Sequence, residues 1–442
     1  MSSSKMPLQD KITLILLVGM SFFLMCDLYI TPSIVLDLAK EYRVDKESIG
    51  YVGSAFVLVG AVISLYFGFM TDRFSRKKLL VLTVLIGEIP CLLTGIPFVT
   101  GTFEGFLAMR ILTGIGVGGI YPLTFSLLSD LFSDRHRAKA IAGIDIAWGI
   151  GMMMGPILGG LALTTEYGWR LAFILAALPN FILAPLFAFY VKEPQRGKTE
   201  TAIAGAIEEG AVYAYRIKLS DFKLIIKNKT NLFMLVQGIP GCIPWGVLTF
   251  WSITYFKEVM KYSQTTSTMV WEIFGIGNAV GLILWAYIGD KIFKKNPRWA
   301  PLFCGFGVIA GTIPCYLFLN INFQSFLILY GFVAFAGMIV SVPGPTQKAI
   351  FMNINRPEHR GSIFSINNLM DSLGKGIGPA VGSIILTLGG SYVFMMNFAV
   401  SCWILCGIIF ILGYFTIEKD RGRMLELLDK RAAEITGAPQ SY

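Results

Sequence analysis

Apolar segments of membrane-spanning length alternate with short polar segments along most of the chain. A helix that crosses the hydrocarbon core needs about 20 mostly apolar residues. Because no backbone amide can stay unpaired in hydrocarbon, such runs are predicted to be helices rather than loops. Twelve runs meet this description, at approximately residues 12–34, 49–70, 79–99, 103–132, 139 onward, 170–191, 230–256, 267–289, 299–319, 326–352, 361–388 and 392–416.

The loop between the second and third predicted helices is short and strongly charged. It reads GFMTDRFSRKK from Gly68 to Lys78 and contains Asp72, Arg73 and Arg76. Clustered cations beside a span favour the cytoplasmic side of a membrane. A glycine at the helix end, Gly68, is expected to let neighbouring helices approach closely.

The composition agrees with a chain that mostly faces lipid or other helices. Of 442 residues, 55% are hydrophobic and only 15% are charged, whereas a soluble chain carries about 25% charge. The net charge of +9 comes mainly from Lys and Arg in the predicted cytoplasmic segments. This distribution is the positive-inside bias of membrane proteins, so we expect no nucleic-acid partner.

No cofactor or metal site is predicted. The seven cysteines are scattered in or beside apolar runs without a CxxC pair, and the two histidines cannot complete a metal site. We interpret the cysteines as small apolar residues of the helix interfaces.

The second half of the chain repeats spaced positions of the first. Asp72–Arg73 corresponds to Asp290–Lys291. At one other constant spacing, further positions match, namely Pro122 with Pro345, His136–Arg137 with His359–Arg360, Gly151 with Gly374, Gly155–Pro156 with Gly378–Pro379, and Gly159 with Gly382. We therefore expect a six-helix bundle over 1–191 and a second over 230–442 that ends in a basic cytoplasmic tail. Between them we expect a cytoplasmic linker over 192–229, with an interfacial helix at about 202–226. A plain disordered linker is the alternative.

The charged loop, G-x-x-x-D-R-x-x-R-[KR], resembles the signature loop between helices 2 and 3 of the major facilitator superfamily. The resemblance implies an all-α membrane protein with twelve transmembrane helices in two six-helix bundles related by pseudo-twofold symmetry. It also implies a substrate site between the halves near the midplane. Gating of the cytoplasmic side would then fall to Gly68, Asp72, Arg73 and Arg76, with Asp145 and Asp290.

A block from Arg110 to Glu200 is similar to the Spinster-like transporters of lysophospholipids and sphingolipids. An Arg opens the fourth helix, followed by a Gly-rich run, "SDLF", a basic turn, a Gly-Pro pair and a Pro-Arg-Gly loop, and Asp27 lies in the first helix. Val117 and Leu28 stand where those transporters usually carry an acidic residue and an Arg.

Two glycine-rich runs lie inside predicted helices. "GIGVGG" at 114–119 mimics a dinucleotide-binding loop, but no strand precedes it, so close helix packing is the better interpretation. "GMMMGPILGG" at 151–160 resembles the fifth-helix motif common among antiporters of the superfamily. Helix packing is therefore predicted for Gly151, Gly155, Pro156, Gly159, Gly378 and Pro379.

Ionisable residues at bilayer depth cost at least about 2.5–3.5 kcal/mol each on insertion scales, so each needs a role. Counting about 1.5 Å per helical residue puts Asp27 and Arg110 at similar depth, where we expect them to pair. An anionic head group that engages Arg110 would release Asp27 to take up a proton. The alternatives are a purely structural pair that fixes helix packing, or no contact between the two side chains.

Roles are also expected for the other charged residues of the predicted spans. Glu88 is expected to relay protons or to stay neutral in a helix interface. Asp145 is expected to brace the cytoplasmic gate. Asp371 and Lys375, one turn apart, are expected to neutralise each other in part, with Lys375 as a second anion anchor. Glu272 is expected to reach water at the outer end of its helix.

Aromatic residues expected to line the cavity, or to contact lipid, include Tyr121, Trp148 and Trp245.

These features predict a secondary active transporter that works by alternating access and is coupled to protons. Its substrate would be a small organic or amphipathic solute, such as an anionic lysophospholipid. A multidrug/proton antiporter is one alternative and a non-transporting receptor is another, while an enzyme is disfavoured. We expect a monomer in contact with membrane lipids, multi-pass in a prokaryotic-type inner membrane, with both termini cytoplasmic.

Overall fold

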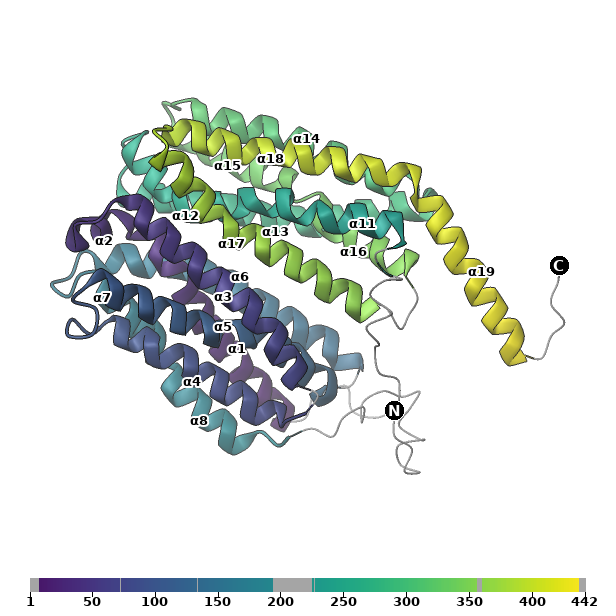
Figure 1. The fold of residues 1–442 in the computed structure, drawn as a ribbon, viewed down its shortest axis with the longest axis horizontal. Coiled ribbons are helices and arrows are strands. Elements are labelled where there is room, and N and C mark those ends of the chain that lie inside the picture. The colour runs from purple at the N-terminus through teal and green to yellow at the C-terminus, as the bar shows by residue number, and fades with distance from the viewer. Residues whose placement is uncertain are drawn as a thin grey trace. The chain divides into compact units, whose positions relative to one another are not determined.

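The computed structural model describes residues 8–71, 73–132, 134–193, 225, 227–355 and 360–436, and within them the ordered elements are helical, with no strand (Figure 1). The helices are α1 (Leu8–Ile30), α2 (Val35–Tyr42), α3 (Lys46–Met70), α4 (Arg76–Thr94), α5 (Phe103–Leu131), α6 (Asp134–Ala162), α7 (Arg170–Ala177), α8 (Asn180–Tyr190), α11 (Lys229–Val236), α12 (Gly238–Glu258), α13 (Gln264–Lys295), α14 (Trp299–Asn320), α15 (Phe326–Val340), α16 (Pro343–Ile354), α17 (Arg360–Thr387), α18 (Tyr392–Leu412) and α19 (Ile417–Thr436).

The predicted spans match this helix order. In the described part of the chain, 10 helical segments are long and apolar enough to cross a membrane. Two further helices, α4 with 19 residues and α17 with 28, reach spanning length but carry more polar and charged residues. With these two included, the helices agree with the twelve predicted spans.

Three predicted spans are interrupted near a proline. The sixth is divided into α7 and α8 before Asn180, the seventh into α11 and α12 before Gly238, and the tenth into α15 and α16 before Pro343. Pro179, Pro240 and Pro343 lie at these breaks. Proline has no N–H group to donate to the preceding turn, so the helical hydrogen-bond ladder is broken there.

The chain divides into two compact units. The first comprises Met1–Tyr215, Phe250–Thr268 and Pro379–Thr387, and the second comprises Arg216–Thr249, Met269–Gly378 and Leu388–Tyr442. The predicted interfacial helix of the linker, at about 202–226, lies outside the described residues except for residue 225. Asp72 of the charged loop also lies outside them.

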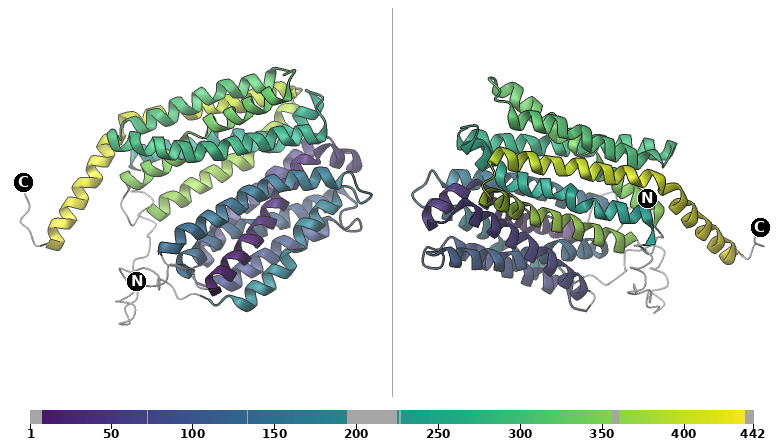
Figure 2. Two further views of the ribbon diagram at one scale, coloured as in Figure 1. Left: turned by 180° about the vertical axis from the view of Figure 1, so that it is seen from behind. Right: turned by 45° about the horizontal axis from the view of Figure 1, so that its top comes forward.

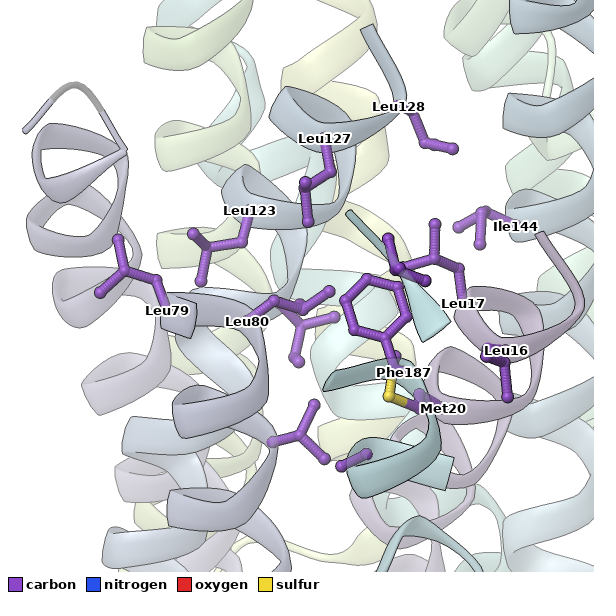
Figure 3. Close-up of a cluster of buried hydrophobic side chains, with 14 of the residues drawn as sticks. Leu16, Leu17, Met20, Leu79, Leu80, Leu123, Leu127, Leu128, Ile144 and Phe187 are labelled. Carbon is purple, nitrogen blue, oxygen red and sulfur yellow. The ribbon is translucent and has the colours of Figure 1, made fainter. Parts of the chain in front are cut away.

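The first unit has an apolar core near the end of the bundle that carries the start of α4. Side chains of α1, α4, α5, α6 and α8 point toward one another there, as Figure 3 shows for Leu17, Leu80, Leu127, Ile144 and Phe187. Lipid tails are as apolar as leucine, so close packing rather than the hydrophobic effect stabilises such contacts in a bilayer.

Glycines lie at close helix contacts in both units. A methyl group added at Gly155 of α6 would lie 2.5 Å from the Cys26 carbonyl oxygen of α1. One added at Gly378 of α17 would lie 2.6 Å from the Cα atom of Gly246 in α12. The corresponding glycines of the repeat therefore serve corresponding helix pairs.

The other predicted packing residues agree with this pattern, with one exception. Gly151 and Gly159 also abut α1 and its following turn, and Pro156 and Pro379 lie inside their helices. A methyl group at Gly68, however, would meet only the Pro122 Cβ atom, at 4.0 Å. The close approach expected at Gly68 is thus wrong, because α3 and α5 instead converge at Gly60, Gly114 and Gly118.

The segment after the last span, predicted as a basic tail, is helical. Helix α19 continues from α18 and projects from the second unit in each of the views (Figures 1 and 2). Asp420 of α19 accepts hydrogen bonds from the backbone N–H and the hydroxyl of Thr230, at 2.9 and 2.8 Å. The start of α19 is therefore held on the first turn of α11.

Candidate functional site

A buried ion pair lies within the first unit. Arg110 of α5 donates to the Asp27 carboxylate of α1 over 2.7 Å. Each residue is 1% exposed. The contact expected from the depths of the two side chains is therefore present, while its role stays a prediction.

Threonines and aromatic rings complete the surroundings of the guanidinium. Arg110 also donates to the hydroxyls of Thr94, over 2.9 Å, and Thr113, over 3.3 Å. Its guanidinium carbon lies 4.5 Å from the ring centroid of Phe173. Of these neighbours, only Thr113 was within reach of sequence reasoning, since it is one turn from Arg110 on the same helix.

Each member of the ion pair has one polar atom that no described residue hydrogen-bonds. Asp27 Oδ2 and Arg110 Nε are buried and have no hydrogen-bond partner among the described residues. A buried carboxylate is stabilised by its cation, and removing either partner leaves an uncompensated charge.

A second buried carboxyl lies on α4 close to this pair. Glu88 is 1% exposed and accepts a hydrogen bond from the side-chain amide of Asn180, over 2.5 Å. Asn180 is the first residue of α8, directly after the break at Pro179. No sequence signal linked it to Glu88, since the contact depends on how α8 is turned against α4.

The charged loop of the predicted gate contacts the segment that follows α8. The Glu193 carboxylate accepts from the backbone N–H groups of Arg76 and Lys77, at 3.0 and 2.9 Å, and from the Ser75 hydroxyl, at 2.6 Å. Glu193 was not among the predicted gate residues. Arg76 is buried, and its side chain also reaches the Ser126 carbonyl oxygen of α5 over 3.4 Å.

Partial burial works to raise the pKa of Glu193. The hydrogen bonds from Ser75, Lys77 and Arg76, with the Arg76 charge, outweigh that effect and hold the pKa below its ordinary value of 4.5. Arg73, by contrast, is exposed, with its guanidinium carbon 4.3 Å from the Phe69 ring centroid.

The predicted aromatic residues of the first unit lie together. Tyr121 of α5 and Trp148 of α6 have ring centroids 5.4 Å apart, and Phe125 packs against both. Tyr121 is exposed, and so is Asp145, which lies one turn before Trp148 on α6.

In the second unit, Trp245 belongs to a ring cluster. Its ring centroid lies 5.7 Å from that of Phe274 and 5.6 Å from that of Trp403. The charged residues Asp371 and Lys375 lie on α17. Asp371 accepts a hydrogen bond from the side-chain amide of Asn367 over 3.0 Å, and Lys375 is exposed. Asp290 is exposed and pairs with Lys294 on its own helix, at 2.6 Å.

Glu272 of α13 is buried, contrary to the prediction for it. It was expected to reach water near the outer end of its helix, but it is only 7% exposed, and its Oε1 has no hydrogen-bond partner among the described residues. Depth along a helix does not determine which way a side chain points, and the rotation of α13 about its axis turns Glu272 inward.

Comparison with known proteins identifies the fold and the family. The family model described as Major Facilitator Superfamily matches residues 15–354 and 273–433. The chain is 25% identical to the cis,cis-muconate transport protein of Acinetobacter baylyi over 87% of this chain and 89% of that protein. It is 22% identical to the sphingosine-1-phosphate transporter SPNS2 of Danio rerio, over 65% of this chain and 58% of that protein.

A solved structure with the same fold is a bacterial homologue of the human lysosomal transporter Spinster, in an inward-facing and unoccupied conformation. The TM-score is 0.80 at 17% sequence identity, over 94% of this chain and 99% of that chain. The predicted all-α fold and the Spinster-like similarity are both confirmed.

Proposed function

This chain belongs to the Major Facilitator Superfamily of transporters, and on that premise we propose that it is a proton-coupled secondary transporter of an organic anion. We assign the coupling between substrate transport and proton transport to Asp27 and Arg110, which form the buried ion pair of α1 and α5. Alternating access would expose this pair to substrate and protons in turn.

The ion pair supports the proposal because it links two binding events. A substrate anion that takes Arg110 removes the cation that stabilises the Asp27 carboxylate. A carboxyl that loses its cation in a buried site binds a proton more readily. Binding of the anion and binding of the proton therefore favour each other, and this linkage is reciprocal.

The substrate class follows from the same guanidinium. Arginine binds carboxylate and phosphate groups through two parallel hydrogen bonds. The two relatives described above are named for muconate, a dicarboxylate, and for sphingosine 1-phosphate, a phosphate ester. An organic anion is the chemistry that these two names share, and an amphipathic anion such as a lysophospholipid falls within it.

The proposal extends to the rest of the transport cycle. Arg73, Arg76, Asp72, Asp145 and Asp290 would gate the cytoplasmic side. Both termini and the linker would then be cytoplasmic, as the distribution of Lys and Arg favours. The aromatic side chains of Tyr121, Trp148 and Trp245, with Lys375 as a second cation, would contact the substrate.

The test is transport by purified protein in proteoliposomes with an imposed pH gradient, with muconate and sphingosine 1-phosphate as separate probes. We expect the wild type to accumulate at least one probe in response to the gradient. Asp27→Asn should lower this accumulation to the level of empty vesicles, because the residue can no longer exchange a proton.

A matched control is Glu104→Gln, which neutralises an exposed carboxylate in the first turn of α5. It should transport like the wild type. Gradient-driven accumulation by Asp27→Asn equal to that of the wild type would remove Asp27 from the coupling mechanism.

A further inference from the structure

The contact between Glu88 and Asn180 has an unusual hydrogen-bond balance. Asn180 is 0% exposed, and its amide nitrogen donates both to Glu88 Oε1, over 2.5 Å, and to the Met20 carbonyl oxygen, over 3.3 Å. Glu88 Oε2 and Asn180 Oδ1 are buried and have no partner among the described residues. Each group thus uses one of its two polar atoms and leaves the other unused.

The Met20 carbonyl determines how the Asn180 amide is oriented. A backbone carbonyl oxygen only accepts hydrogen bonds, so the NH₂ group of Asn180 must face it. The remaining atom of that amide, Oδ1, is therefore an acceptor. It lies on the same planar group as the nitrogen that binds Glu88.

The two unused atoms match only if Glu88 carries a proton. An ionised carboxylate has acceptors alone, so Oε2 and Oδ1 would both lack a donor. A protonated carboxyl has an O–H group on Oε2 that donates to Oδ1. The terminal torsions of both side chains are soft, so the carboxylic acid and the amide can close a ring of two hydrogen bonds.

The surroundings of Glu88 offer it no cation of its own among the described residues. Asp27 of α1 and Arg110 of α5, with the thiols of Cys26 and Cys91, are the charged and titratable groups nearby. The Arg110 cation is already bound to Asp27, Thr94 and Thr113. Burial without a cation of its own penalises a charged carboxylate.

We propose that Glu88 and Asn180 form a carboxylic acid–amide pair that holds one proton inside the first unit, on helices α4 and α8. Glu88 binds the proton and Asn180 is the positioning residue that orients it. The use of this proton in transport rests on the proposed function. Its presence in the folded protein does not.

Infrared spectroscopy of the full-length protein in lipid nanodiscs at neutral pH tests this directly. A protonated carboxyl has a C=O stretching band above the amide I region, and the band shifts when H₂O is replaced by D₂O. We expect the spectrum of Glu88→Gln to lack one such band of the wild type. Glu104→Gln, which alters an exposed carboxylate, should lose none.

Two further variants keep the test decisive. Glu88→Gln should fold with an unchanged melting temperature, because its side-chain NH₂ replaces the O–H donor toward Asn180 Oδ1. Asn180→Leu removes the amide, so the Glu88 band should move to higher frequency as its hydrogen bonds are lost. If Asn180→Leu does not fold, the D₂O shift of the band lost in Glu88→Gln still reports whether Glu88 carries an O–H group.

An unchanged carboxyl region in Glu88→Gln would overturn the proposal, since Glu88 would then be ionised. A band that is insensitive to a folded Asn180→Leu variant would overturn the role of Asn180. These results are independent of transport. The band can be present in a protein that fails the pH-gradient test, and it can be absent from one that passes it.

Discussion

In the first half of the repeat, Gly155 of α6 packs on the carbonyl of Cys26, one residue before Asp27. In the second half, Gly378 of α17 packs on Gly246, one residue after Trp245. Beside the shared packing position, the first half has a buried ion pair with Arg110. The second half has aromatic rings.

The same contrast holds at the position of Arg110. By the repeat spacing that relates Gly155 to Gly378, Arg110 corresponds to Val333, which is buried in α15. Helix packing is thus common to both halves, whereas the buried cation belongs to one. The two halves therefore differ in the side chains beside the shared packing position, with a buried ion pair in the first and aromatic rings in the second.

The largest expected effect comes from breaking the ion pair. Arg110→Met leaves Asp27 as a buried, unpaired carboxylate and should destabilise the protein by about 3–5 kcal/mol. Adding Asp27→Asn should recover part of that loss, because the uncompensated charge is removed. Melting temperatures in detergent measure both effects.

The matched change in the second half is Val333→Ala, which removes apolar contacts but no charge and should cost less. Equal losses for Arg110→Met and Val333→Ala, or no recovery in the double variant, would contradict the asymmetry between the halves.

An intermediate and symmetrical effect is expected from the packing glycines. Gly155→Ala and Gly378→Ala each place a methyl group against the backbone of a neighbouring helix, and each should cost about 1–3 kcal/mol. Gly149→Ala and Gly275→Ala are controls in α6 and α13, since nothing lies within 4 Å of a methyl group at either site. Thermal unfolding should show losses of similar size at the two packing sites and none at the controls.

The smallest effect concerns how each half anchors the segment after its last span. Glu193, after α8, caps α4, whereas Asp420, after α18, caps α11. Because the Glu193 side chain is 35% exposed, Glu193→Gln should cost no more than about 1 kcal/mol at neutral pH.

The pH dependence of this cost gives a sharper measurement. The pKa of Glu193 in the folded protein lies below its ordinary 4.5, so its ionised form stabilises the fold above that pH. The stabilisation is lost as the pH falls through the lowered pKa. The difference in stability between wild type and Glu193→Gln should therefore shrink below about pH 4.5, and Glu166→Gln, at an exposed loop position, should show no such change. A difference that is constant with pH would exclude an ionised cap.

Much of the architecture could be predicted because its determinants are local in sequence. A span needs a minimum number of apolar residues in one run, and the predicted runs match α3, α5 and α14 almost to their ends. Depth along two such helices was enough to pair Asp27 with Arg110. The repeated Gly155 and Gly378 predicted close packing in both halves, because only a missing side chain lets two backbones approach.

Other features depended on how each helix is turned about its axis. Successive helical residues point about 100° apart, so composition and depth cannot say which neighbour a side chain meets. Gly68 therefore proved not to be a close-packing site, and Glu272 proved to be buried. The contact of Asn180 with Glu88, and the cap that Glu193 forms on α4, bring together residues far apart in the chain. Only the packing of whole helices against one another decides such contacts, whereas the length and polarity of each run already decide that the helices exist.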